Sequence, residues 1–266
     1  GTLYNTYGFF ALYANVDEFT FAEEEIPYKE KPELDRWIIS QLNSLIKEVG
    51  ENYENYSPTK AGRAISEFVT ENLSNWYVRL SRKRFWGGEY SKDKLSAYQT
   101  LYTCLETVAK LASPIAPFYM DRLYSDLNKI SGRGEDMSVH LTEFPVVLES
   151  SIDKDLEVRM DLAQRVSSLV LGLRRKVNLK VRQPLGKIMV PVMNKQQEEQ
   201  LQNVENIILS EVNVKALELV TDASGVCTKK VKPNFKLLGS RFGKLMKQAA
   251  AIINGFDQEQ IIEIEK

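Results

Sequence analysis

The sequence predicts a mainly α-helical protein, with a helical bundle over residues 1–184 and a small α/β unit over residues 185–266. Three observations carry this prediction. Apolar residues recur every three or four positions through most of the first part, which is the spacing of amphipathic helices. After Arg182 the pattern changes to short segments that alternate between strand-like and helical spacing. Prolines and glycines separate the predicted elements.

The first predicted helices are marked by apolar stripes and by their starting residues. A stripe over residues 3–14 predicts an opening helix that nothing caps, and we therefore expect the chain to be part of a longer protein. A second stripe, over residues 34–49, follows Pro32, which suits a first helical turn because its missing N–H has no partner there. A third helix is predicted over residues 57–86, opened by Ser-Pro and followed by Gly-Gly.

Prolines divide the rest of the predicted bundle. A stripe over residues 91–112 is followed by Pro114 and Pro117, and each proline lacks a donor and clashes with the preceding turn. We expect a break there, then a shorter helix through Leu127. An irregular connection leads to a long helix over residues 153–178.

Residues 185–266 alternate between predicted strands and predicted helices. Residues 185–192 and 213–221 predict strands, and residues 194–210 between them predict a helix. Residues 234–253 predict a last helix, and the alternating segment 260–266 predicts a last strand.

Composition excludes several classes of protein. Apolar residues make up 43% and charged residues 27% of the 266 residues, which is typical of globular proteins. The only cysteines are Cys104 and Cys227 and the only histidine is His140, which excludes a zinc ribbon, a C-x-x-C pair or a histidine-dependent triad within these residues. Two separate thiols favour a reducing, cytoplasmic location, and we expect Cys104 to be a small core side chain. The formal net charge of -1 means that any attraction to nucleic acid must come from local patches.

One such patch lies in the segment NWYVRLSRKRFW, residues 75–86, which contains no acid. At helical spacing, Trp76 and Tyr77 continue the buried stripe, whereas another face is shared by Arg79, Arg82, Lys83 and Trp86. A basic face with an exposed ring suits a phosphate backbone, with stacking on an unpaired base. The alternative is a solvated helix end, whose cations are stabilised by the C-terminal dipole.

Two further acid-free segments are basic, over residues 162–197 and 223–256. Segregated patches in a nearly neutral chain are typical of a polyanion binder, although each patch alone could be a solvated face. The residues also lack a catalytic constellation: the only G-x-G, in SGRGED, follows no predicted strand, and His140 fits a structural or surface residue better than a general base. The residues alone therefore describe a binding module.

Several motifs resemble a known family. Residues 71–86 closely resemble a helix of the anticodon-binding domain of class I aminoacyl-tRNA synthetases, in the subclass for isoleucine, valine, leucine and methionine. Residues 111–127 resemble the next helices of that domain. Residues 138–145 and 173–190 are most similar to the isoleucine-specific members, and the resemblance covers essentially the whole chain.

The resemblance implies an anticodon-binding helical bundle, followed by a small α/β unit, that binds the tRNA for isoleucine. Trp76 is the weakest candidate for a contact because the apolar stripe buries it. The candidate tRNA-binding residues that the motifs imply are Asn75, Arg79, Arg82, Lys83, Arg84, Trp86, Arg174, Arg175, Lys180, Arg182, Gln183 and Lys187.

The sequence also departs from complete members of the family. Neither an H-I-G-H-like nor a K-M-S-K-S-like motif is present, and the residues of a Rossmann core and an editing domain are missing. The resemblance implies that ATP and Mg act in the catalytic core of the same polypeptide, and that this fragment has no cofactor, metal site or catalytic residue and is inactive alone. No membrane partner is expected. The alternatives are a stand-alone RNA-binding module, a protein-interaction scaffold, or the same region of a valine-specific member.

Overall fold

The computed structural model describes residues 1–134, 137–220, 231–257, 260–261 and 264. The chain divides into two compact units, residues 1–164 and 165–266. This division falls inside a long helix, whereas the boundary predicted after residue 184 marks the change in secondary structure and stays a prediction. In the described part of the chain, no helix is both long and apolar enough to cross a membrane.

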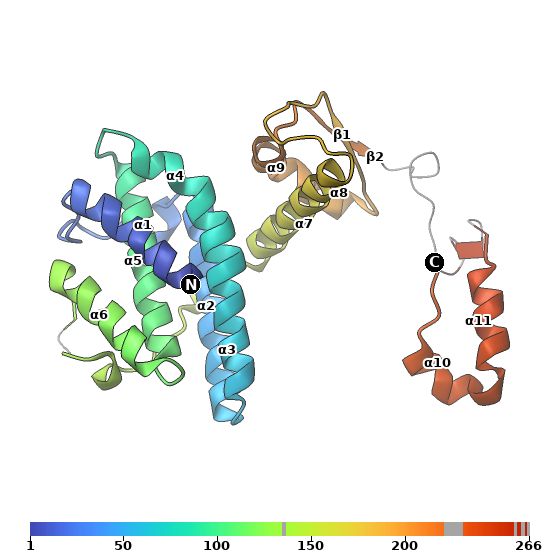
Figure 1. Ribbon diagram of the computed structural model, residues 1–266, viewed down its shortest axis with the longest axis horizontal. Coiled ribbons are helices and arrows are strands. Elements are labelled where there is room, and N and C mark those ends of the chain that lie inside the picture. Colours follow the sequence, from blue (N-terminus) through green and yellow to red (C-terminus); the bar gives the residue numbers. More distant parts are fainter. Residues whose placement is uncertain (135–136, 221–230, 258–259, 262–263, 265–266) are drawn as a thin grey trace. The chain divides into compact units, whose positions relative to one another are not determined.

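The first unit is a bundle of helices (Figure 1). Its elements are α1 (Thr2–Val16), η1 (Tyr28–Glu30), α2 (Glu33–Glu54), α3 (Pro58–Glu67), η2 (Phe68–Val78), α4 (Arg79–Trp86), α5 (Lys92–Ala112), α6 (Pro117–Ser131), η3 (Val139–Leu141) and η4 (Glu149–Ser151). Helix α7 (Lys154–Lys176) begins in this unit and continues into the second.

Helix α5 lies at the centre of the bundle, where it contacts α1, α2, α3, α4 and α6. Most of its side chains are buried, including Tyr98, Leu101 and Leu105. Cys104 is buried there too, as expected of a small core side chain. The central helix thus fixes the positions of the helices around it.

The predicted proline break is confirmed. Helix α5 ends at Ala112, and α6 begins at Pro117, in the first turn where its missing donor costs nothing. The last residue of α6 is Ser131, four positions beyond the predicted end near Leu127, and Gly132 caps the helix in the left-handed conformation. The helix predicted over residues 57–86 is also present, but its middle, η2, is a π-helix that the sequence pattern did not indicate.

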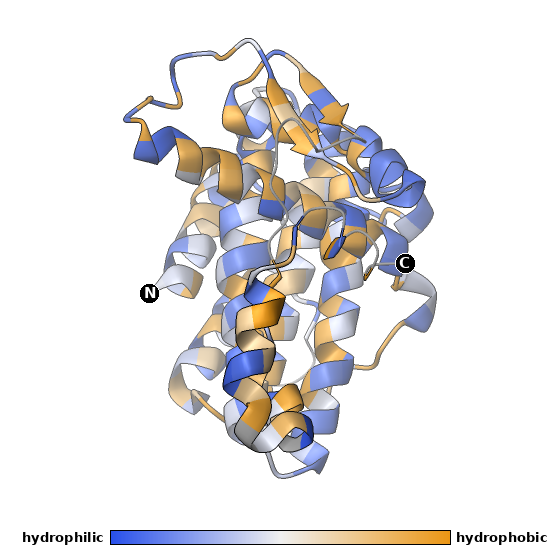
Figure 2. Cartoon of the chain, turned by 90° about the vertical axis from the view of Figure 1, so that its right-hand side faces the viewer, coloured by the Kyte–Doolittle hydropathy of each residue, from blue (hydrophilic) through white to orange (hydrophobic). Residues whose placement is uncertain are grey.

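The second unit contains a small parallel sheet. Strand β1 (Ile188–Pro191) pairs with β2 (Leu217–Val220), in a register that sets Ile188 opposite Leu217. Between them lie α8 (Lys195–Asn203) and α9 (Glu205–Val212), where the sequence predicted one helix, and Val204 separates the two. Figure 2 shows mostly hydrophobic colouring on the strands, and their residues are half-buried or exposed.

The C-terminal elements differ from prediction in two ways. The helix expected over residues 234–253 is divided into α10 (Phe235–Phe242), the short η6 (Gly243–Leu245) and α11 (Met246–Asn254), with a positive φ of 46° at Gly243. The strand predicted over residues 260–266 is wrong where the structure describes it, since Gln260, Ile261 and Ile264 are helical. A helix satisfies its own backbone hydrogen bonds, whereas a strand needs a partner, and none of the described strands pairs with this segment.

Candidate nucleic-acid interface

A basic face lies on α4, the last part of the long helix that begins at α3. Arg79, Arg82 and Lys83 are exposed on it, and the Trp86 side chain is 58% exposed. These four residues, hereafter the α4 face, combine three cations with one exposed ring. The arrangement can contact phosphates and stack on an unpaired base.

Two neighbouring residues in the same motif have different surroundings. Asn75 is exposed, and its Nδ2 donates to Glu71 Oε2 at 3.4 Å. Trp76 is buried, as the apolar stripe predicted. The ring available for stacking in this motif is therefore that of Trp86.

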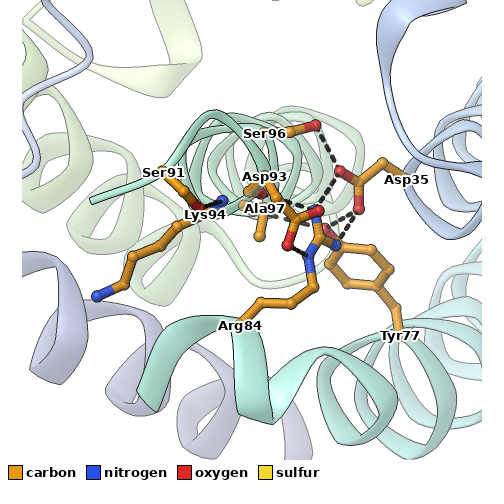
Figure 3. Close-up of polar contacts among 8 residues, drawn as sticks. All are labelled: Asp35, Tyr77, Arg84, Ser91, Asp93, Lys94, Ser96 and Ala97. Carbon is orange, nitrogen blue, oxygen red and sulfur yellow. Dashed lines mark hydrogen bonds and ion pairs between the residues drawn. The ribbon is translucent and has the colours of Figure 1, made fainter. Parts of the chain in front are cut away.

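Arg84 is directed into the bundle. Its Nη1 and Nη2 donate to the two carboxylate oxygens of Asp35 at 2.6 and 2.8 Å, and its Nε donates to Asp93 Oδ2 at 2.9 Å (Figure 3). The Asp35 carboxylate also accepts from the hydroxyls of Tyr77 and Ser96. Burial and then Asp35 raise the pKa of Tyr77 well above its usual value, which keeps that phenol a donor.

The sequence interpretation missed this role of Arg84, which ties α4 to α2 and α5. Asp35 was the signal that could have revealed it. It lies among the apolar positions of α2 and is fully buried, and a buried carboxylate requires a partner.

The motif at residues 173–190 contains a turn over residues 178–184, between the end of α7 and the first residues of the sheet region. Arg174 lies beneath this turn and is only 2% exposed. Its Nη1 donates to the carbonyls of Lys180 and Gln183 at 3.1 and 3.0 Å, and its Nη2 donates to the Asn213 carbonyl at 3.0 Å. The Arg174 guanidinium is therefore directed at the backbone, and its contact with RNA stays a prediction.

Asn213 completes this arrangement from the end of α9. Its Nδ2 donates to the Val181 carbonyl at 2.7 Å. The side chains of Arg174 and Asn213 thus donate hydrogen bonds to three carbonyls of the turn, those of Lys180, Val181 and Gln183, and fix its backbone. The side chains of Lys180, Arg182 and Gln183 are exposed.

The remaining candidates, Arg175 and Lys187, are both exposed but differ in their contacts. Arg175 lies on the surface of α7, whereas Lys187 pairs with Glu218 of the neighbouring strand. In the third basic segment, Lys229 and Lys230 lie outside the described residues. Exposed cations on and beside α10 and α11 are Lys232, Lys236, Arg241 and Lys247.

Comparison with known proteins identifies the family. A model described as the anticodon-binding domain of tRNA ligase matches residues 35–190, which include the α4 face and the 178–184 turn. The chain belongs to this family of anticodon-binding domains. Its relatives include proteins named isoleucine–tRNA ligase from Bacteroides thetaiotaomicron, which is 62% identical over all 266 residues, and from Bacteroides fragilis, which is 61% identical over the same length. A protein of the same name from Cytophaga hutchinsonii is 57% identical over the whole chain.

The anticodon-binding chain is much shorter than these relatives. It spans 23% of the length of each Bacteroides protein and 24% of the Cytophaga protein. The match therefore concerns one region of a larger ligase.

Proposed function

We propose that this chain is the tRNA-binding region of an isoleucine–tRNA ligase and that it recognises the anticodon loop of the tRNA for isoleucine. The larger polypeptide attaches isoleucine to that tRNA in the cytoplasm, with ATP and Mg bound in a catalytic core outside these residues. The observation that carries the proposal is the family match over residues 35–190, together with relatives of one name along the whole chain.

Each of the two units carries one proposed RNA-binding surface, and the two surfaces have different tasks. The α4 face presents two guanidinium groups, one ammonium group and the indole ring of Trp86. These groups can contact phosphates and stack on an unpaired base. The 178–184 turn presents Arg182 and Gln183, whose side chains make paired hydrogen bonds to base edges. We assign positioning on the phosphate backbone to the α4 face and reading of bases to the turn.

Two of the sequence candidates, Arg84 and Arg174, are left out of these two surfaces. The N–H groups of Arg84 are directed at Asp35 and Asp93, and Arg174 is buried beneath the turn. Neither guanidinium reaches a phosphate without breaking several hydrogen bonds and leaving a buried group unpaired, which is costly.

The experiment is a binding titration of the chain with a labelled transcript of the tRNA for isoleucine, followed by fluorescence anisotropy. A transcript with an exchanged anticodon is the matched control, and an acidic protein is the competitor. The proposal expects tighter binding of the first transcript than of the second, and little competition. Equal binding of both transcripts would favour a non-specific RNA-binding module. Displacement of RNA by the acidic protein at similar concentration would favour a protein-interaction scaffold.

A further inference from the structure

The 178–184 turn has an unusual support, a buried cation that pairs with carbonyls and not with a carboxylate. Arg174 is 2% exposed, and among the described residues no acid forms an ion pair with it. Its partners are the carbonyls of Lys180, Gln183 and Asn213, at 3.0 to 3.1 Å. Arg174 also lies in the last turn of α7, where the helix dipole favours a positive charge.

Packing alone does not explain this choice of residue. A buried charge loses its hydration, and an apolar side chain would fill the same space without that cost. A guanidinium differs from an apolar group in presenting five donors in one plane, so that it can hold several carbonyls in a fixed arrangement. The contacts of Arg174 with two separate points of the turn, at residues 180 and 183, use this property.

Asn213 supports the turn from a second direction. Its Nδ2 donates to the carbonyl of Val181, the residue between the two points that Arg174 holds. It has a positive φ of 51°, the left-handed conformation in which it ends α9. Its backbone carbonyl accepts from both Arg174 Nη2 and the N–H of Leu185. One residue therefore connects the turn, the end of α9 and the start of the sheet region.

We propose that Arg174 and Asn213 are positioning residues for RNA recognition, which hold the 178–184 turn in its binding conformation before the RNA arrives. This inference rests on the proposed function. With the carbonyls drawn inward, the exposed side chains of Lys180, Arg182 and Gln183 project from a fixed backbone. Binding then orders only side chains, and a smaller loss of conformational entropy strengthens binding.

Asn213 offers a clean test because glycine also adopts the left-handed conformation. The variant Asn213→Gly keeps the backbone geometry and removes only the donor to Val181. A second variant, Arg174→Lys, keeps the charge but replaces the planar fork by a single ammonium. The matched control is Asn203→Gly, at the exposed end of α8, where among the described residues no hydrogen bond of the asparagine side chain is present.

The measurements are tRNA affinity, its salt dependence, trypsin cleavage after Lys180 and Arg182, and thermal unfolding. We expect both variants to bind the tRNA for isoleucine about five- to tenfold more weakly, because the loosened turn must be ordered on binding. The slope of log K against log salt stays the same, since no exposed cation is lost. Cleavage in the turn should become faster, and Asn203→Gly should match the unaltered chain in tRNA affinity, salt dependence and cleavage of the turn.

Three outcomes overturn the inference. Unchanged affinity in both variants, with faster cleavage or a lower melting temperature, would make the two residues supports of the fold only. Unchanged affinity and unchanged cleavage would mean that the turn does not depend on them. If the unaltered chain binds no tRNA, the proposed function fails and this inference fails with it, whereas the first two outcomes leave the proposed function intact.

Discussion

The guanidinium of Arg84 forms a bidentate ion pair with the carboxylate of Asp35, with N–O distances of 2.6 and 2.8 Å. Asp35 is fully buried and the Arg84 side chain is 15% exposed, so the pair lies largely out of water. Residues 49 positions apart in the chain are thereby joined, and the basic end of the long helix is fixed against the bundle.

Replacement of Asp35 by asparagine should destabilise the first unit strongly. Removing one partner of a buried ion pair leaves the other charge uncompensated, which typically costs about 3–5 kcal/mol. The exposed pair of Lys92 and Glu30 provides the control, and Glu30→Gln should cost only about 0–1 kcal/mol. Urea unfolding measures both values, and similar losses in the two variants would contradict the role given to Asp35.

The chain alone should not activate isoleucine. No H-I-G-H-like or K-M-S-K-S-like motif is present in its 266 residues, and we place ATP binding elsewhere in the larger ligase. Isoleucine-dependent exchange of pyrophosphate into ATP is the direct assay, with a complete relative as positive control. Exchange above background, from a preparation free of host synthetase, would refute the assignment.

Binding of tRNA should be strongly salt dependent. If ~4–6 phosphates are neutralised, log K against log salt should have a slope of roughly -0.7 to -0.9 per phosphate. The triple change of Arg79, Arg82 and Lys83 to glutamate should weaken binding of all tRNAs alike and reduce the slope. The same charge change at Lys29, Lys60 and Arg63, which are exposed elsewhere on the first unit, is the control. Equal effects of the two triple variants would assign the attraction to overall charge.

Acid should loosen the connection between α6 and η3. Asp121 accepts from the Ser138 hydroxyl at 2.6 Å and from the Val139 N–H at 3.0 Å. These bonds, with a smaller effect of His140, lower the pKa of Asp121. A carboxyl group with a lowered pKa contributes its full stabilisation above the ordinary pKa of about 4, and that contribution is lost as the pH falls through the folded value.

Amide hydrogen exchange at Val139 measures this effect. After correction for the intrinsic rate, protection should fall as the pH drops below about 4. In Asp121→Asn, protection should already be low at neutral pH and should not change in this range. Equal pH profiles of the two proteins would show that Asp121 does not hold the segment.

Apolar periodicity predicted most helices and the two paired strands, because burial of one face determines these elements. It did not indicate the π-helix at Phe68–Val78, since π and α winding both satisfy the backbone internally and packing decides between them. The strand predicted at the C-terminus was wrong for a related reason, as alternation alone supplies no pairing partner.

The candidate site was predictable as a set of segments but not residue by residue. The acid-free motifs correctly indicated exposed cations such as Arg82 and Arg182. They gave no sign that Arg84 and Arg174 turn inward. Asp35 lies 49 positions from Arg84, and the groups that hold Arg174 are backbone carbonyls, which every residue carries. Asn213 appeared in no basic motif, and only the folded chain brings it beneath the turn.

Reading of the anticodon by the 178–184 turn is tested most directly by the difference in affinity between the cognate tRNA and a tRNA with an exchanged anticodon. It should be measured for the unaltered chain and for Gln183→Ala and Arg182→Lys. We expect each variant to lose about 1–3 kcal/mol of binding to the tRNA for isoleucine and little with the exchanged tRNA, because a base contact exists only in the cognate complex. Equal losses on both tRNAs, or unchanged binding to both, would contradict base recognition by this turn.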